Sequence, residues 1–281
     1  MRSTKTLGCS RELYISGKET STMAIAIVPK DNMAEYVFCT TFNKKLYDEY
    51  AHQLIDTYVA TNQLAHMYVF VEDNVRLYPK IDKVHYYNLF DYEPDCKDFV
   101  ERNKHRKANT FYEEAIRFSY KVFAQSAARH RGDKVIYVDS DCKFMDTIPG
   151  TWYQQLIPNL TFLSFYDRPN QYTETGLVAF NTQPNGDYSL CDKFFQEYKN
   201  WYITDKVYSI NKLGKNFWTD CHTLDATRQM FKNIPNYNEK PLGDGGNGHI
   251  MARDKFISPY IDHRKGSRKK QSNSPEWRKN R

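Results

Sequence analysis

The sequence predicts an α/β protein with a mainly parallel central sheet, and three observations support this fold class. Short runs of β-branched and aromatic residues alternate with segments whose apolar residues recur at helical spacing, the pattern of repeated strand–helix–strand units. Residues 134–138 form an almost unbroken β-branched and aromatic run, as expected for a strand buried on both faces. Two aspartates follow that run closely, where open parallel sheets bind their ligands.

The first half of the chain shows this alternation clearly. Residues 36–41 are a β-prone run, and apolar residues at helical spacing follow from 46 to 58. Further strands are predicted at 67–71 and 83–90. Residues 91–109 are polar and interrupted by proline, so we expect a loop with a short helix there.

The second half is predicted from the same signals. Helices are expected at 111–129, 190–201 and 219–231, the last of them being the final helix, and strands at 134–138, 161–166 and 176–181. The glycine-rich residues 243–248 predict a flexible loop. We expect one domain over residues 34–270, an irregular arm over 1–33 and a basic, flexible tail over 271–281.

Cysteine use and hydropathy bear on where the protein works. The six cysteines are scattered without a C-x-x-C pair, so most are expected to be reduced and buried rather than paired or zinc-bound. No apolar run approaches the roughly 20 residues that cross a bilayer, and the short run at 23–28 is not a signal-peptide core. These features lead us to expect a cytoplasmic protein without a transmembrane segment.

The chemistry-bearing residues begin with Asp139-Ser140-Asp141, the only Asp-x-Asp triplet in the chain. Two carboxylates at the end of a buried strand are suited to hold Mg²⁺ or Mn²⁺, which prefer oxygen ligands and keep coordination positions for substrate phosphates. The cation would neutralise a departing diphosphate as a Lewis acid. The alternative is that these acids only close the strand as turn residues.

The formal net charge is +6, and its excess gathers near the C-terminus. The basic residues there are Arg264, Lys265, Arg268, Lys269, Lys270, Arg278, Lys279 and Arg281, against the single acid Glu276. A solvated, partly disordered terminus is one interpretation. A phosphate-binding element is the other, because His263 could complete a cation site, Gly266 permits close backbone approach and Lys269 could meet a phosphate.

These motifs together resemble those of GT-A glycosyltransferases. Asp139-Ser140-Asp141 is similar to their DxD motif, and His263-x-x-Gly266-x-x-Lys269 to the HxxGxxK element of the glycogenin-like and bacterial lipopolysaccharide galactosyltransferase-like families. Residues 174–181 resemble the glycine-containing strand on the acceptor side, and uncharacterised bacterial and phage glycosyltransferases carry similar patterns. The resemblance covers about residues 34–270. The families continue with Lys-Pro-Trp, whereas Lys270 and Gln271 follow here.

The resemblance implies a single GT-A, Rossmann-like domain and a specific ligand set. Asp139, Asp141 and His263 would bind Mn²⁺ or Mg²⁺, while Gly266 and Lys269 would contact the donor diphosphate. It also implies a nucleoside-diphosphate sugar as donor, with a UDP-sugar expected, and retention of the anomeric configuration, because HxxGxxK is characteristic of retaining families. The acceptor, whether glycan, lipid-linked or protein, stays open.

Supporting positions are predicted on either side of the DxD strand. Thr40 and Thr41 end the first strand, where GT-A enzymes seat the nucleoside, although a plain strand-to-helix turn explains them equally. Arg117 and Lys121 lie one helical turn apart and repel each other, so a shared anionic ligand would stabilise them.

Three carboxylates are candidates for the acceptor base or for stabilising an oxocarbenium-like transition state: Asp220, Glu174 and Asp225. Asp220 stands at a helix start, where an aspartate is commonest as an N-cap.

Two other classes of protein would show different sequence features. A sugar-nucleotide nucleotidyltransferase would carry a glycine-rich signature after the first strand, and residues 41–45 contain no glycine. A nucleic-acid-binding module would interleave basic and aromatic residues over a face, whereas the basic cluster here is terminal. No nucleic-acid partner is therefore expected, and a metal-dependent glycosyltransferase is the predicted function.

Overall fold

The computed structural model describes residues 34–270 except 169, 170, 185, 213 and 247. The arm predicted over 1–33 and the tail predicted over 271–281 lie outside the described residues. Within the described part, no helix is both long enough and apolar enough to cross a membrane.

The centre of the fold is a seven-stranded sheet in the order β10-β6-β7-β4-β1-β2-β3. Its strands are β1 (Ala34–Phe42), β2 (His66–Val71), β3 (Val84–Asn88), β4 (Gly132–Val138), β6 (Leu163–Tyr166), β7 (Glu174–Asn181) and β10 (Glu239–Leu242). Only β7 runs antiparallel to its neighbours, β4 and β6, and the other adjacent pairs are parallel. The predicted α/β class with a mainly parallel sheet is confirmed.

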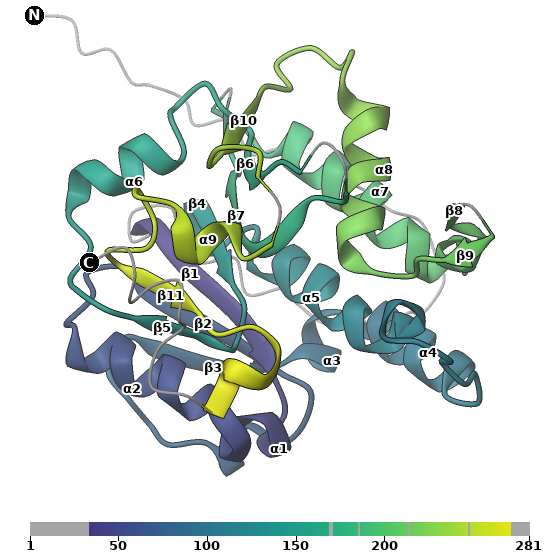
Figure 1. Cartoon of the computed structure of the whole chain (residues 1–281), viewed down its shortest axis with the longest axis horizontal. Coiled ribbons are helices and arrows are strands. Elements are labelled where there is room, and N and C mark those ends of the chain that lie inside the picture. The colour runs from purple at the N-terminus through teal and green to yellow at the C-terminus, as the bar shows by residue number, and fades with distance from the viewer. Residues whose placement is uncertain (1–33, 169–170, 185, 213, 247, 271–281) are drawn as a thin grey trace, which may run out of the picture.

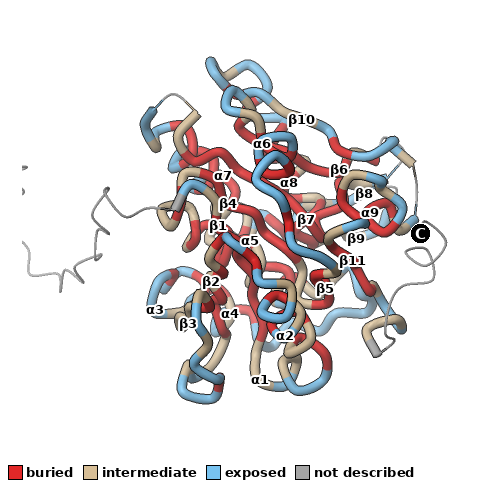
Figure 2. Tube along the Cα trace, turned by 90° about the vertical axis from the view of Figure 1, so that its left-hand side faces the viewer, coloured by how far each residue is buried: buried red, intermediate tan, exposed pale blue. Residues whose placement is uncertain are grey.

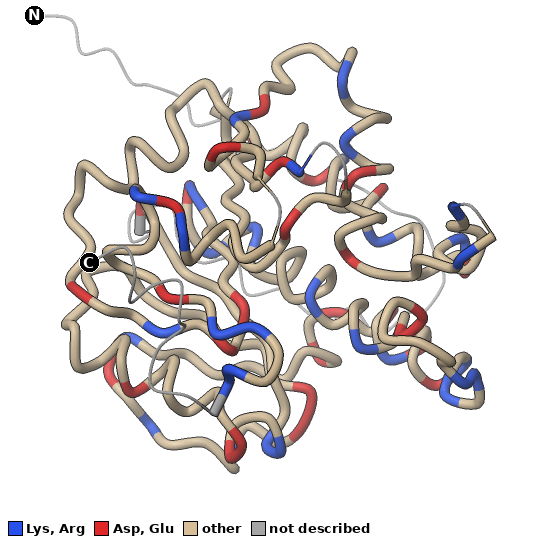
Figure 3. The backbone as a smooth tube through the Cα atoms, in the orientation of Figure 1, with Lys and Arg blue, Asp and Glu red and all other residues tan. Residues whose placement is uncertain are grey.

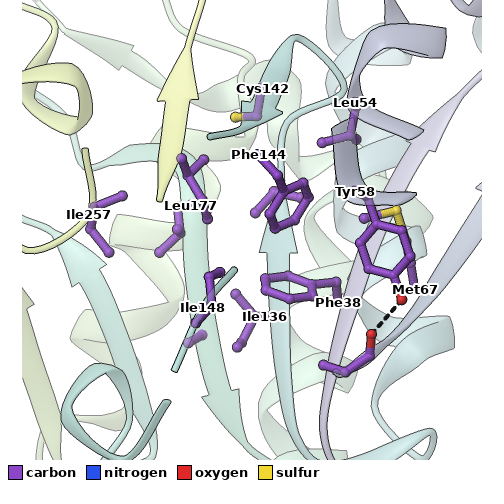
Figure 4. Packing of buried hydrophobic residues seen from close by; sticks show 14 of the residues in the cluster. Phe38, Leu54, Tyr58, Met67, Ile136, Cys142, Phe144, Ile148, Leu177 and Ile257 are labelled. Carbon is purple, nitrogen blue, oxygen red and sulfur yellow. Dashed lines mark hydrogen bonds between the residues drawn. The ribbon is translucent and has the colours of Figure 1, made fainter. Parts of the chain in front are cut away.

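Both faces of this sheet are covered, which gives a three-layer arrangement (Figure 1). One face packs on α2 (His52–Ala60) and α6 (Gly150–Leu156), and the other on α5 (Ala115–Ala128), α7 (Ser189–Ile203) and α8 (Asp220–Phe231). Phe38 of β1 belongs to the first hydrophobic cluster, and its neighbours Val37 and Cys39 belong to the second. Figure 2 shows the resulting band of buried strands, and Figure 4 the packing around Phe38, Phe144 and Tyr58.

The helix predicted at 46–58 consists of three parts, α1 (Lys44–Leu46), a π-helical segment (Tyr47–Ala51) and α2. The segment 91–109, predicted as a loop with a short helix, is more helical than expected: α3 (Leu89–Tyr92) ends in it and α4 (Pro94–Asn103) occupies about half of its length. The Asn88 side chain accepts a hydrogen bond from Phe90 N and caps α3, so the strand predicted to reach residue 90 stops at 88. Pro94 begins α4 instead of interrupting it, since a helix needs no N–H donor at its first position.

Other boundaries and short elements also differ. The helix predicted from 111 begins at Ala115, after the 3₁₀ turn Phe111–Glu113. The helix at 219–231 is not the last, because α9 (Ile250–Arg253) follows it. Elements that were not predicted are α6, β10, β5 (Cys142–Phe144), β8 (Asn211–Lys212), β9 (Lys215–Asn216), β11 (Ile261–His263) and the 3₁₀ turns Val75–Leu77, Lys206–Ser209 and Gly266–Lys270.

One of these short pairings connects the C-terminal segment to the middle of the chain. β11 pairs antiparallel with β5, so that His263 lies opposite Cys142 (Figure 1). Since β5 follows the end of β4, this pairing carries the C-terminal segment to the carboxyl ends of the parallel strands. The five described cysteines, 39, 96, 142, 191 and 221, are free and buried, as predicted.

Candidate active site

A cavity of about 990 Å³ opens at the carboxyl ends of β1 and β4. Most of the predicted site residues line it: Thr41, Arg117, Lys121, Asp139, Ser140, Asp141, Glu174, Asp220, His263, Gly266 and Lys269. Thr40 and Asp225 are not among its lining residues. This volume matches that of small-molecule sites, roughly 300–1,000 Å³.

The innermost group consists of Asp139, Asp141 and His263. The Nε2 atom of His263 lies 3.1 Å from Asp141 Oδ1 and 3.5 Å from Asp139 Oδ2. The β5–β11 pairing fixes this approach, and Arg264 N donates to Asp141 O at 3.2 Å beside it. Two motifs more than a hundred residues apart in sequence thus form one site.

Gly176 on β7 makes room for this histidine. A Cβ atom on Gly176 would lie 2.4 Å from His263 Cε1 and 2.7 Å from Nδ1, well inside van der Waals contact. The same residue accepts a hydrogen bond at its carbonyl from Asp139 N, at 2.9 Å. The glycine in the predicted 174–181 strand therefore permits the close approach of β11 to β7.

Each aspartate also has a lysine partner. Lys121 Nζ lies 2.8 Å from Asp139 Oδ1, and Lys269 Nζ lies 3.1 Å from Asp141 Oδ2. Figure 3 shows basic residues of the C-terminal segment beside acidic residues at this end of the sheet. Burial opposes ionisation of both carboxyls, but Lys121 and His263 at Asp139, and His263 at Asp141, outweigh it and hold each pKa well below its usual range.

The pKa of His263 shifts in the opposite direction, upward. Burial acts to lower the pKa of His263, but the carboxylates of Asp141 and Asp139 outweigh it and raise the pKa to about 9. Binding of a cation at Nε2 would therefore displace a proton from the imidazole.

One observation supports a divalent cation beside Asp139, Asp141 and His263. Asp141 Oδ1 and His263 Nε2 are both buried, and neither has a hydrogen-bond partner within the described residues although they lie 3.1 Å apart. Cys142 completes a group with Asp141 and His263 whose ligand atoms all lie within 4.8 Å of one another. Burial raises the pKa of Cys142 well above its usual value, and its side chain packs in the hydrophobic cluster (Figure 4). A thiol that stays protonated is a poor ligand, so Asp139 is the better third one.

Lys121 connects this group to the wall of the cavity. Its ammonium also lies 2.9 Å from Asp220 Oδ2, which accepts a hydrogen bond from Thr175 Oγ1 at 2.5 Å. The N-cap of α8 is Thr219, and Asp220 is the first helical residue, with no exposed surface. Arg117 pairs with Glu114 at 2.8 Å. Each of the two cations thus has a carboxylate partner of its own, and the repulsion argument for a shared anionic ligand does not apply.

The other two candidate carboxylates are tied to cations. Glu174 binds Lys265 at 2.6 Å and Arg168 at 3.2 Å; burial opposes its ionisation, but Lys265, His263 and Arg168 lower its pKa. Asp225 lies outside the cavity lining, and accepts hydrogen bonds from Thr173 and from Arg228 Nη1 at 2.9 Å.

The two threonines at the end of β1 differ. Thr41 lines the cavity and donates its hydroxyl to Phe70 O at 2.7 Å, while Thr40 is fully buried on the strand. Gly266 has a φ of +67°, a left-handed conformation that favours glycine.

Sequence reasoning missed several residues of the site. Lys265 lies within the predicted HxxGxxK element, so it had a signal by position. Arg168 and Glu72, which also lines the cavity, follow strands and had no motif to indicate them.

No model of a protein family and no curated protein matches the sequence. Among solved structures, mouse xyloside xylosyltransferase 1 in its apo form is similar, with a TM-score of 0.46 and 12% sequence identity. The match covers 75% of this chain and 86% of that chain.

Proposed function

We propose that this chain is a metal-dependent glycosyltransferase that moves a sugar from a nucleoside-diphosphate donor, with a UDP-sugar expected. The observation that carries the proposal is the meeting of Asp139, Asp141 and His263 around buried atoms without hydrogen bonds. The mainly parallel seven-stranded sheet, with this group at the end of β4, is consistent with a GT-A-like fold.

Asp139, Asp141 and His263 would hold Mn²⁺ or Mg²⁺. When bound, the cation supplies a Lewis acid that neutralises the departing diphosphate. Lys269 stands 3.1 Å from Asp141 and lines the cavity, so its ammonium can meet a phosphate oxygen close to the cation site. The exposed backbone at Gly266 lies on the same segment and admits close approach of the ligand.

Thr41, with its neighbour Asn43, lies at the end of β1 on the cavity wall, a place for the nucleoside. Glu72 follows β2 next to it and accepts a hydrogen bond from Asn43 Nδ2 at 3.0 Å. Polar groups that present both donors and acceptors at a strand end are suited to a nucleobase edge.

Retention of configuration is part of the proposal, because the three candidate carboxylates are already engaged. Asp220 Oδ2 contacts Lys121 and Thr175, and Glu174 contacts two cations. An inverting enzyme needs a carboxylate that can take the acceptor proton. On a retaining route the leaving diphosphate accepts that proton, and Asp220 acts by positioning Lys121.

The alternatives receive no support from the described residues. Helix α1 begins at Lys44, directly after its N-cap Asn43, which leaves no glycine-rich loop of the nucleotidyltransferase kind. The basic residues Arg264, Lys265 and Lys269 contact Gln53, Glu174 and Asp141 within the fold. Lys265 and Lys269 line the cavity and Arg264 is buried, so these three cations do not form an open surface for nucleic acid.

Calorimetry with UDP, with and without Mn²⁺, tests the function. We expect binding that requires the cation and that Asp139→Asn abolishes, while Asp98→Asn, an exposed acid on α4 outside the cavity, leaves binding unchanged. Equal affinity for UDP in EDTA would refute the metal role. A screen of sugar nucleotides would then identify the donor.

Proton NMR of the product linkage tests the stereochemistry. An α-linked donor should give an α-linked product, and Asp220→Asn should keep substantial turnover, whereas removal of a true base costs about 10²–10⁴-fold. A β-linked product would refute retention.

A further inference from the structure

Four aromatic side chains form a closed cluster at the wall of the cavity. Ring centroids are 6.0 Å apart for Tyr112–Tyr172, 4.9 Å for Tyr172–His222, 4.6 Å for His222–Phe217 and 5.5 Å for Phe217–Tyr112. They come from four separate segments: the 3₁₀ turn before α5, the loop before β7, the residue after β9 and the first turn of α8. We call this set the aromatic cluster.

The aromatic cluster does not fill the protein core. Tyr112, Tyr172 and Phe217 belong to neither hydrophobic cluster and are not among the side chains packed against them. Tyr112 is 36% exposed, and the other three rings are partly exposed. Aromatic groups gathered from four segments but left accessible to solvent indicate a binding surface rather than packing.

The cluster is continuous with the candidate active site. Tyr112 and Tyr172 line the same cavity as Asp139 and Asp220. His222 lies two residues after Asp220, and its Nδ1 is 2.8 Å from Thr219 Oγ1. Asp220 in turn shares Lys121 with Asp139. A ligand on the rings would therefore lie beside the cation site, on the side of the cavity away from β1.

The rim of this part of the cavity is polar. Arg106, which is exposed, and Glu113, which is partly exposed, line the same cavity, and Glu113 Oε1 accepts a hydrogen bond from Asn216 Nδ2 at 3.0 Å. The Tyr112 and Tyr172 hydroxyls are 3.5 Å apart. An alkyl chain would strip water from these groups without replacing their hydrogen bonds, which costs free energy.

We propose that the aromatic cluster binds a sugar ring of the acceptor, so that the acceptor is a carbohydrate or a glycoconjugate. One face of a pyranose carries C–H groups with slight positive charge, which pack on the negative face of an aromatic ring. Its hydroxyls point sideways, where the rim offers polar partners. This inference rests on the proposed glycosyltransferase function, and it specifies the acceptor class at that same site.

The test uses saturation-transfer NMR on the full chain loaded with UDP and Mg²⁺. The probes are methyl glycosides of common hexoses, their octyl glycosides, octanol and an unglycosylated serine- and threonine-containing peptide. We expect at least one methyl glycoside to receive saturation mainly on the protons of one ring face. Replacing Mg²⁺ by paramagnetic Mn²⁺ should then broaden those same protons, because the sugar lies near the cation site.

Variants separate stacking from a structural role. Tyr172→Ala should weaken glycoside binding about tenfold, the scale of one lost stacking contact, while Tyr172→Phe, which keeps the ring, should bind nearly as the natural chain does. Tyr92→Ala is the matched control, since Tyr92 is 42% exposed but lies outside the cavity lining. Calorimetry with UDP and Mg²⁺ on every variant checks that the donor side remains intact.

The outcomes are distinguishable. If the natural chain shows no cation-dependent UDP binding, the proposed function itself is refuted. The aromatic cluster is refuted as the acceptor site if UDP binding is intact but no glycoside receives saturation. It is also refuted if Tyr172→Ala leaves glycoside binding unchanged. Saturation of octanol or the peptide alone would also refute it. Tighter binding of octyl than of methyl glycosides would support the proposal and point to a lipid-linked source of the sugar.

Discussion

Gly176→Ala offers the sharpest test of how the site is built. The added Cβ would lie 2.4 Å from His263 Cε1, whereas ordinary contact begins at 3.4 Å, so the imidazole must move by about 1 Å. Three residue pairs between β11 and β5 hold the backbone of His263 in register. The side chain therefore has to rotate, and Nε2 leaves its position 3.1 Å from Asp141.

The expected cost has two parts. Overpacking of this kind lowers the free energy of unfolding by about 1–3 kcal/mol. Displacement of one cation ligand should weaken Mn²⁺ binding by about 10–100-fold, the scale known for disturbed metal shells. Thermal unfolding and Mn²⁺ titration followed by electron paramagnetic resonance measure the two effects. Gly150→Ala is the control, because a Cβ there has no neighbour within 4 Å.

A double substitution makes the reasoning refutable even if the single variant is unstable. In Gly176→Ala with His263→Ala the imidazole is gone, and the remaining close neighbour of the added methyl group is Met251 Sδ at 3.0 Å, in a flexible side chain that can shift. The methyl group should therefore cost little more than His263→Ala alone. If the methyl group costs as much without the histidine as with it, the close approach to His263 is not the reason for the glycine. Unchanged Mn²⁺ affinity in a folded Gly176→Ala protein would refute the argument as well.

Three further predictions concern stability. The folded-state pKa of Glu174 lies below its ordinary value of 4.5, so the stability that its carboxylate contributes is present above that pH and is lost as pH falls. In urea unfolding, Glu174→Gln should be less stable than the natural chain by about 2–4 kcal/mol at pH 7, and this difference in free energy of unfolding should narrow by pH 3. A difference that stays constant with pH would contradict this. Burial, reinforced by Asp73, raises the pKa of Glu72 to about 7 against the opposing bond from Asn43, so its ionisation costs stability as pH rises from 4.5 through 7. Glu72→Gln should therefore be more stable than the natural chain by about 3 kcal/mol at pH 8, and the difference should close toward pH 4. No difference at pH 8 would count against this. Arg264 is fully buried and donates to Gln53 Oε1 at 2.6 Å and Lys269 O at 3.0 Å. Arg264→Leu should lower the free energy of unfolding by about 2–4 kcal/mol and weaken UDP binding, whereas Ser267→Ala, at an exposed residue, is the control. Equal behaviour of the two variants would refute the role of Arg264.

Much of the fold could be predicted because its strands bury both faces. Residues 135–138 alternate between the two hydrophobic clusters, and this leaves an apolar run that is visible in the sequence. β5 and β11 have three residues each, too few for any periodicity, so their pairing could not be foreseen. The extent of helix α4 was underestimated because Pro94 was interpreted as an interruption, whereas it is the first residue of the helix.

The candidate site divides in the same way. Asp139, Asp141 and His263 lie in motifs with recognisable spacing, and in the structure these three side chains lie close together. Partners across the fold left no local signal: Lys121 meets Asp220 almost a hundred residues later, and Arg168 meets Glu174 across a loop. Such pairs depend on how helices lie on the sheet, which a single sequence does not encode in any short pattern.

The β5–β11 pairing also bears on the order in which the molecule assembles. Strands β1, β2 and β4 precede residue 139, so a growing chain can form most of the parallel core before residue 261 is synthesised. His263 is among the last residues of the described chain to arrive, and its docking closes a loop of more than a hundred residues. The entropic cost of such a closure rises only slowly with loop length. Without these last residues the sheet would lack the His263 imidazole beside Asp141, so synthesis itself delays completion of the proposed cation site until the described part of the chain is nearly finished.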